Sequence, residues 1–202
     1  MDFIRDYFTN QDITGVFSAL GVSLKTTFLV LVIILVIGCV ASAVEKITTF
    51  IISIFLGGAF ALVFCNYITF PGVILHELSH ALVALLTGAK VTEIHFFKLG
   101  TPIGYVTYHE RGPRFIRALQ SSLTACAPVV FGSVVALLLI DVLTKGSYSV
   151  GVTVLLVYLI ISVIDHMTMS IPDIIYFFKG IWALAAFILT ISLIICLNCI
   201  QP

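Results

Sequence analysis

The chain has 202 residues, of which 60% are hydrophobic and 10% are charged, and its mean hydropathy is +1.20. Soluble domains carry about 25% charged residues, so this composition excludes an ordinary water-soluble protein and a disordered chain. Ten basic residues balance ten acidic residues, and a net charge of zero provides no electrostatic footprint for a nucleic acid. We therefore expect an integral, multi-pass membrane protein that contacts the lipid bilayer and no nucleic acid.

The N-terminal part of the chain predicts a surface segment followed by two spans. Residues 1–22 place apolar side chains at helical spacing among polar neighbours, which is typical of an amphipathic segment at the membrane surface. A transmembrane helix needs about 20 mainly apolar residues. Residues 23–44 and 47–67 meet that length and are separated by Glu45 and Lys46. We expect two successive transmembrane helices here.

A third apolar window and a polar region follow. The window opens at Pro71 and is expected to end near Gly88, because glycine commonly follows the last turn of a helix. Residues 89–120 carry too many charges to span a membrane, but they include two stretches rich in β-branched and aromatic residues, which predict strands. These strands are expected at 91–98 and 103–109, joined by a turn at 99–102. We interpret the pair as a β-hairpin at the membrane edge.

Apolar windows resume in the C-terminal half, at 121–142, 150–164 and 181–200. The sequence contains no internal repeat and no low-complexity linker, so a single domain is expected over residues 1–202. The predicted fold class is an all-α polytopic membrane protein with about six transmembrane helices and a small membrane-edge β-hairpin.

Several ionisable residues lie in or beside these apolar windows, where a charge costs at least about 2.5–3.5 kcal/mol at the bilayer centre. They form two groups along the chain: His76, Glu77 and His80, then Asp165, His166 and Asp173. Because such residues are expensive in lipid, we expect them to have a function.

The first group has the pattern His-Glu-x-x-His. On a helix, His76 and His80 lie one turn apart on the same face, so their imidazoles can bind one tetrahedral Zn²⁺. Glu77 then lies close enough to act as a general base toward a water molecule that zinc activates. The structural alternative is a pair of histidines that are hydrogen-bonded within a helix bundle. The apolar surroundings favour the metal site.

A catalytic zinc ion needs a third protein ligand. The candidates are Asp173, Asp165, His166 and Asp141. Asp173 follows Pro172, and a helix break at the proline would let a carboxylate point into a cavity at membrane depth. Alternatively, Ser170 and Asp173 form a helix capping box, in which the carboxylate only satisfies backbone N–H groups. We favour Asp173 as the ligand, keep Asp165 and His166 as auxiliary candidates, and expect Asp141 at the membrane interface.

These residues and their neighbours resemble the signature of the site-2 protease family of intramembrane zinc metalloproteases. The similarity lies in residues 76–82, 88–91, 125–128 and 172–173. It covers about residues 65–180, which it marks as a catalytic core. The resemblance implies a zinc-dependent endopeptidase, with one Zn²⁺ per chain, that hydrolyses a peptide bond within or next to a transmembrane segment of a membrane-protein substrate.

The same resemblance implies roles for individual residues. His76, His80 and Asp173 would bind zinc, and Glu77 would be the general base. The family pattern has an asparagine where this chain has Asp165, and an ionised carboxylate cannot donate a hydrogen bond to an oxyanion. The hairpin would capture an unwound substrate by β-addition. The candidate residues of the capturing edge are Ile103, Gly104, Tyr105 and Val106. The alternative is a hairpin that only packs against lipid headgroups.

Two other functions are compatible with the sequence. A membrane metal transporter also places His and Asp residues in its spans, although transport paths usually show several metal positions or a repeat. A catalytically inactive scaffold of the same fold is the other possibility, although the chain retains Glu77. The expected location is the plasma membrane of a prokaryotic cell.

Overall fold

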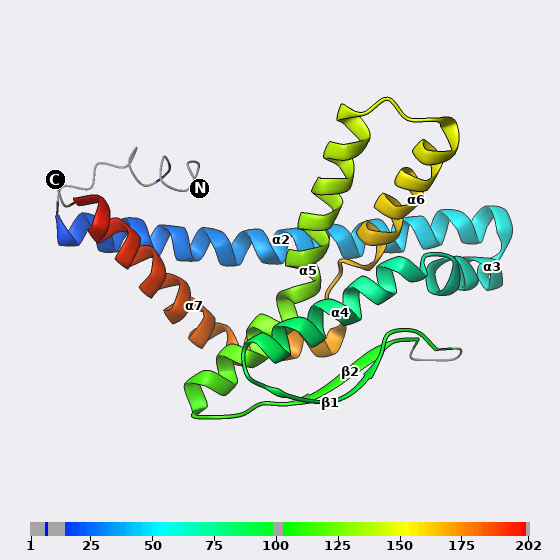
Figure 1. Ribbon diagram of the computed structural model, residues 1–202. Coiled ribbons are helices and arrows are strands. Elements are labelled where there is room, and N and C mark those ends of the chain that lie inside the picture. The colour runs from blue at the N-terminus through cyan, green and yellow to red at the C-terminus, as the bar shows by residue number, and fades with distance from the viewer. Residues whose placement is uncertain (1–6, 8–14, 99–102, 201–202) are drawn as a thin grey trace.

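The computed structural model describes residue 7 and residues 15–98 and 103–200, and helices dominate it (Figure 1). The helical elements are α2 (Val16–Leu56), α3 (Gly58–Val63), the π-helical turn η1 (Phe64–Ile68), α4 (Phe70–Leu86), α5 (Arg114–Lys145), α6 (Val150–His166) and α7 (Ile171–Ile200). The two strands are β1 (Lys90–His95) and β2 (Tyr105–His109). The predicted combination of a helical fold with one small hairpin is confirmed.

The number of spans differs from the prediction of about six. Within the described residues, 3 helices are long and apolar enough to cross a membrane: α2, α5 and α7, the last over Ile171–Asn198. The apolar helices α4 and α6 have 17 residues each, which corresponds to about 26 Å of helix at 1.5 Å per residue. A bilayer core is about 30 Å thick, so these two helices fall short of a full perpendicular crossing. Hydropathy windows therefore overcounted the spans.

The first two predicted spans belong mostly to one helix. Helix α2 runs for 41 residues through Glu45 and Lys46, which do not interrupt it because both side chains are good helix formers. It ends at Leu56 and is followed by Gly57, whose backbone has a φ of 86°. The predicted second span, residues 47–67, is therefore divided among the end of α2, the short α3 and the turn η1.

The predicted surface segment over residues 1–22 is only partly described. Its last part, from Val16 onward, forms the start of α2 and is continuous with the long helix. Residues 1–6 and 8–14 lie outside the described part of the chain.

The elements around the third window agree with the sequence. Helix α4 includes Pro71 in its first turn and ends at Leu86, as expected before Gly88. Strands β1 and β2 are antiparallel, with pairs running from Lys90↔His109 to His95↔Tyr105 and an irregularity after Val91. The turn predicted at 99–102 lies outside the described residues.

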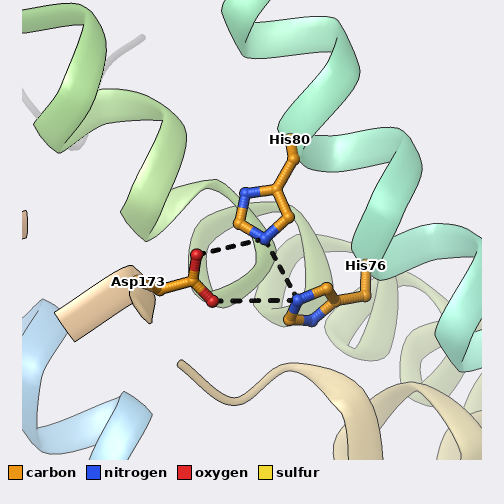
Figure 2. A group of neighbouring side chains, drawn as sticks. All are labelled: His76, His80 and Asp173. Atoms are coloured by element: carbon orange, nitrogen blue, oxygen red, sulfur yellow. Dashed lines mark hydrogen bonds and ion pairs between the residues drawn. The ribbon is translucent and has the colours of Figure 1, made fainter. Parts of the chain in front are cut away.

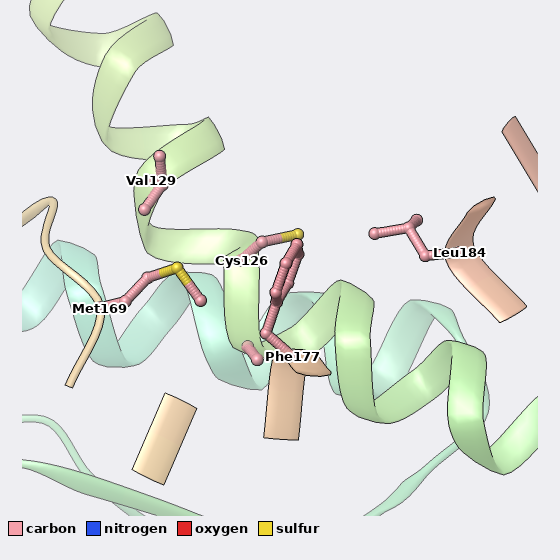
Figure 3. Packing of buried hydrophobic residues seen from close by; sticks show 6 residues of the cluster. Cys126, Val129, Met169, Phe177 and Leu184 are labelled. Carbon is pink, nitrogen blue, oxygen red and sulfur yellow. The ribbon is translucent and has the colours of Figure 1, made fainter. Parts of the chain in front are cut away.

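The hydrophobic core lies mainly where α5 packs against α7 (Figure 3). Its buried members are Ala125, Cys126, Val129, Met169, Phe177 and Leu184. Helix α5 also contacts α4 and α6, so it joins the elements that carry the ionisable residues. It bends along its length (Figure 1), and Pro128 lies inside it, where a proline removes one backbone hydrogen bond.

Helices α4 and α6 approach each other closely at Gly72. A Cβ atom at this position would lie 2.0 Å from the backbone oxygen of Ser162, so only glycine fits. The Gly72 N–H donates to the Ser162 Oγ at 2.8 Å, and that hydroxyl donates to the Thr69 carbonyl at 2.8 Å. This contact fixes the C-terminal end of α6 beside the histidines of α4.

Candidate metal centre

The two histidines of the His-Glu-x-x-His motif and Asp173 converge on one point (Figure 2). His76 and His80 project from α4, and Asp173 comes from the first turn of α7. The Nε2 atoms of the two imidazoles are 3.1 Å apart. The Asp173 carboxylate places Oδ1 3.5 Å from His80 Nε2 and Oδ2 4.0 Å from His76 Nε2. All three ligand atoms lie within 4.8 Å of one another.

The opposite nitrogen of each ring is held by a backbone carbonyl. The Nδ1 of His76 lies 2.7 Å from the His166 oxygen, and the Nδ1 of His80 lies 2.8 Å from the Thr124 oxygen. A carbonyl oxygen only accepts hydrogen bonds, so both Nδ1 atoms carry the ring hydrogen and donate it. In a neutral imidazole this leaves a lone pair on Nε2, and both lone pairs face the Asp173 carboxylate.

This donor set fits a divalent cation. Two lone pairs 3.1 Å apart beside a carboxylate repel one another unless a positive charge lies between them. Two ligands at about 2.0–2.1 Å from a tetrahedral Zn²⁺ are about 3.3 Å apart, close to the separations observed here. Two imidazoles and one carboxylate leave the fourth tetrahedral position open, as in catalytic zinc sites. The residues that would hold the ion are therefore His76, His80 and Asp173.

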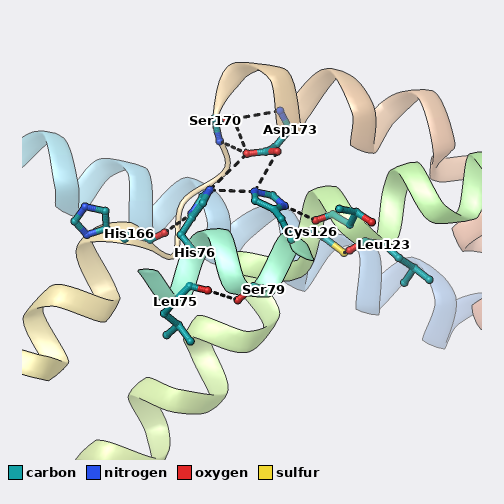
Figure 4. Close-up of polar contacts among 10 residues, drawn as sticks. Leu75, His76, Ser79, Leu123, Cys126, His166, Ser170 and Asp173 are labelled. Carbon is teal, nitrogen blue, oxygen red and sulfur yellow. Dashed lines mark hydrogen bonds and ion pairs between the residues drawn. The ribbon is translucent and has the colours of Figure 1, made fainter. Parts of the chain in front are cut away.

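Asp173 also forms the capping box that the sequence offered as the alternative (Figure 4). Its Oδ2 accepts hydrogen bonds from the Ser170 N–H at 3.0 Å and from the Ser170 hydroxyl at 2.5 Å. The Asp173 N–H lies 3.3 Å from the Ser170 Oγ and completes the box. The two interpretations are therefore compatible, because the cap orients the carboxylate while Oδ1 still faces His80.

The other ligand candidates occupy different positions. His166 contributes its backbone carbonyl to His76, while its ring points away from Asp173 and its Nδ1 donates to the Ser162 carbonyl at 3.0 Å (Figure 4). Asp165 is 3% exposed and is absent from the converging group. Asp141 forms an ion pair with Lys145 at 2.6 Å on the exposed part of α5. Neither the Asp165 side chain nor the His166 ring joins the two histidines.

A cavity of about 370 Å³ opens beside the three ligand residues, and Glu77 and strand β2 line it. Of the predicted edge residues, Gly104, Tyr105 and Val106 line this cavity, while Ile103 lines a neighbouring one. A Cβ atom at Gly104 would lie 2.7 Å from the Cγ of Glu77, so the hairpin passes directly over the glutamate side chain. In the described part of the chain the sheet has two strands, so β2 pairs with β1 on one side only.

The exposed hairpin carries its own polar network. Glu93 Oε1 accepts hydrogen bonds from the Tyr105 hydroxyl at 2.7 Å and from His95 Nε2 at 2.9 Å. The hydrogen bond from Tyr105 and, to a smaller extent, the one from His95 lower the pKa of Glu93. The hydrogen bond to Glu93 in turn raises the pKa of Tyr105. Burial raises the pKa of Tyr108, which lines the metal-site cavity from β2. Tyr108 therefore enters the cavity as a neutral phenol.

The backbone groups that orient the histidines were not predicted. The carbonyls of Thr124 and His166 leave no signature in the sequence, because every residue has a carbonyl group. Glu45 also lies near the site, where it lines the neighbouring cavity. Its sequence signal is an acidic residue between two apolar stretches, which predicts the end of a span and not a position beside the site.

No protein-family model matches the chain, and neither the curated proteins nor the solved structures contain a match. The geometry defines a three-residue group of two histidines and one aspartate that is able to hold a metal ion, in a mostly helical chain with long apolar helices.

Proposed function

We propose that this protein is a zinc-dependent intramembrane endopeptidase similar to the site-2 proteases. The observation that carries the proposal is the convergence of the His76 and His80 Nε2 atoms with the Asp173 carboxylate. These atoms lie in a cavity that Glu77 also lines, beside an edge of β2 that pairs with no other strand among the described residues. The long apolar helices support a location in a membrane, for which we propose the plasma membrane of a prokaryotic cell.

His76, His80 and Asp173 would hold one Zn²⁺, which supplies Lewis-acid activation of a water molecule and of the scissile carbonyl. The carbonyls of His166 and Thr124 keep the two imidazoles in the tautomer that binds a metal through Nε2. The Ser170 hydrogen bonds orient the Asp173 carboxylate in the same way. These contacts organise the donor atoms in advance.

Glu77 would act as the general base. Its side chain lines the cavity next to the donor set, where its carboxylate takes a proton from the attacking water and passes it to the leaving amine. A positioned proton donor and acceptor of this kind contributes roughly 10²–10⁴-fold to a rate.

The substrate would be an unwound part of a transmembrane helix. A helix keeps its carbonyl groups in internal hydrogen bonds, so its backbone must open before hydrolysis. The edge of β2 that does not pair with β1 offers backbone groups to an extended segment, which would then lie across the cavity next to Glu77. This arrangement supports the capture role of Gly104, Tyr105 and Val106.

Two observations favour hydrolysis over the alternatives. A transport path usually has several metal positions, whereas the described residues hold a single group of three potential ligands. An inactive scaffold does not need a carboxylate beside the ligands, and Glu77 lines the cavity there.

The proposal is tested by elemental analysis of the purified protein in detergent together with cleavage of designed transmembrane peptides in proteoliposomes. We expect one zinc per chain and peptide cleavage in the wild type, and loss of both in His80→Ala. His95→Ala, on the exposed hairpin, is the matched control and should retain both. A zinc-free wild type after metal repletion, or cleavage that survives His80→Ala, would exclude the mechanism.

A further inference from the structure

A second, smaller cavity adjoins the metal centre. It has a volume of about 220 Å³ and shares His76, Glu77 and Gly104 with the cavity already described. Its remaining polar wall consists of the side chains of Glu45, Cys65, Asp165, His166 and Thr168. The general base therefore lies between two cavities, one beside the metal ligands and one among acidic groups.

Asp165 is the unusual residue in this wall. Its side chain is 3% exposed, and its Oδ2 atom has no hydrogen-bond partner among the described residues. A buried carboxylate without a full set of partners is strongly destabilising, because it loses its hydration and gains nothing in return.

The lining of the cavity is rich in acidic residues. Glu45 and Asp165 both line it, and His166 already donates its Nδ1 hydrogen to the Ser162 carbonyl. Lys46 follows Glu45 in the chain but lines a different groove, together with Met169 and Phe178, on another side of α2. Three carboxyl groups, those of Glu45, Glu77 and Asp165, thus line the cavity, and its lining contains no lysine or arginine.

We infer that this cavity binds a positively charged side chain, a lysine or an arginine, next to the scissile bond of the substrate. The inference rests on the proposed protease function and names the class of substrate. The cavity lies beside Glu77 and beside the Ile103–Gly104 end of the candidate capturing strand, so a side chain of a captured segment can enter it. An ammonium or guanidinium group in the cavity would be attracted to the acidic side chains of Asp165 and Glu45 and would reduce the repulsion between them.

The charge preference can be measured without any proteolysis, because Cys65 lines the cavity and is partly exposed. Aminoethyl and sulfonatoethyl methanethiosulfonate deliver a cationic and an anionic group of similar size to this thiol. We expect the cationic reagent to modify Cys65 at least about tenfold faster, and the ratio to fall severalfold in Asp165→Asn and in Glu45→Gln. Asp141→Asn removes an exposed carboxylate and should leave the ratio unchanged. Equal rates for the two reagents, or a ratio that Asp165→Asn leaves intact, would overturn the inference.

The substrate preference is measured with transmembrane peptides that carry one lysine, or its uncharged analogue norleucine, at successive positions. Mass spectrometry then maps the cleaved bonds. We expect cleavage at a constant distance from the lysine, with kcat/KM at least about tenfold above the norleucine peptide, and a loss of that preference in Asp165→Asn. Equal cleavage of both series would overturn the inference and leave the protease function intact. If the wild type cleaves no peptide, the proposed function fails and the substrate assignment fails with it, while the Cys65 ratio still decides whether the cavity attracts cations.

Discussion

The Nδ1 hydrogen of His76 is donated to the backbone carbonyl of His166, 2.7 Å away, across the interface between α4 and α6. The ring orientation of a candidate metal ligand therefore depends on how closely two helices pack. Ligand-orienting contacts of this kind typically change metal affinity by roughly 10–100-fold when they are lost. The packing of the helices and the chemistry of the site are thus connected through one hydrogen bond.

Gly72→Ala should weaken zinc binding without changing any ligand. The new methyl group would lie 2.0 Å from the Ser162 carbonyl oxygen, so α6 must move and take the His166 carbonyl away from His76. We expect the zinc Kd, measured by competition with a chelator, to rise roughly 10–100-fold. Gly151→Ala is the matched control, because a Cβ atom on that glycine of α6 meets nothing within 4 Å. An unchanged Kd in Gly72→Ala would show that the helix contact does not orient the ligand.

Ser170→Ala should separate the two roles of Asp173. The substitution removes the hydroxyl that lies 2.5 Å from Oδ2 and leaves the carboxylate itself in place. We expect a zinc Kd about tenfold higher and a loss of roughly 1 kcal/mol in the stability of the first turn of α7. Ser53→Ala is a suitable control, since its exposed hydroxyl bonds only within α2. If only the helix stability changes, the capping box does not support the metal site.

Glu77→Gln should abolish cleavage and preserve metal binding. The amide keeps the size of the side chain but cannot accept a proton from water, so the rate should fall roughly 10²–10⁴-fold. Elemental analysis should still find as much zinc as in the wild type, because Glu77 is not among the converging ligands. Turnover close to that of the wild type would remove Glu77 from the mechanism.

Gly104→Ala should slow hydrolysis by displacing Glu77, without changing any ligand or the general base itself. A Cβ atom there would lie 2.7 Å from the Glu77 Cγ, so the hairpin or the glutamate must shift. A displacement of about 1 Å in a catalytic group can cost about 10² in rate, and we expect a loss of that order in kcat with zinc content unchanged. Thr92→Ala changes an exposed residue of the same hairpin that lines neither cavity, and its activity should match the wild type.

The hairpin should lose stability at low pH. Hydrogen bonds from Tyr105 and His95 lower the pKa of Glu93 in the folded protein. The stabilisation is therefore complete above the unfolded pKa of about 4.3 and is lost as the pH falls through the lower folded value. The Glu93 carboxyl, followed by NMR in a selectively labelled sample, should titrate below that reference value, and Tyr105→Phe should raise its midpoint. A Glu93 midpoint that Tyr105→Phe does not move would contradict the hydrogen bond.

Local sequence signals predicted the local elements. Pro71 and Gly88 marked the limits of α4, and β-branched and aromatic residues marked both strands of the hairpin. The same kind of signal failed at Glu45 and Lys46, because a charged pair lowers hydropathy without breaking a helix. Hydropathy describes composition along the chain, whereas the continuity of a helix depends on backbone conformation, so the number of spans could not be predicted in this way.

In the site, too, the local part could be predicted from the sequence and the long-range part could not. His76 and His80 are four residues apart, so helix geometry alone placed them together. Asp173 comes from a distant part of the chain, and its position depends on the packing of α5 against α7 and α4. The sequence could not decide whether Asp173 is a ligand or a cap. Its carboxylate has both sets of contacts, because Oδ2 accepts from Ser170 while Oδ1 faces His80.

In the proposed membrane location, the shortness of α4 and α6 would have a consequence for the surrounding lipid. Helices of 17 residues cover about 26 Å, so a bilayer core of about 30 Å would have to become thinner or bend where it meets them. Such thinning would bring headgroups and water closer to His76 and Glu77. When a substrate helix opens, its backbone groups lose their hydrogen bonds, and this is costly in hydrocarbon. A thinner bilayer would reduce the thickness of hydrocarbon around those groups. The fold would in this way shape the membrane as well as the substrate.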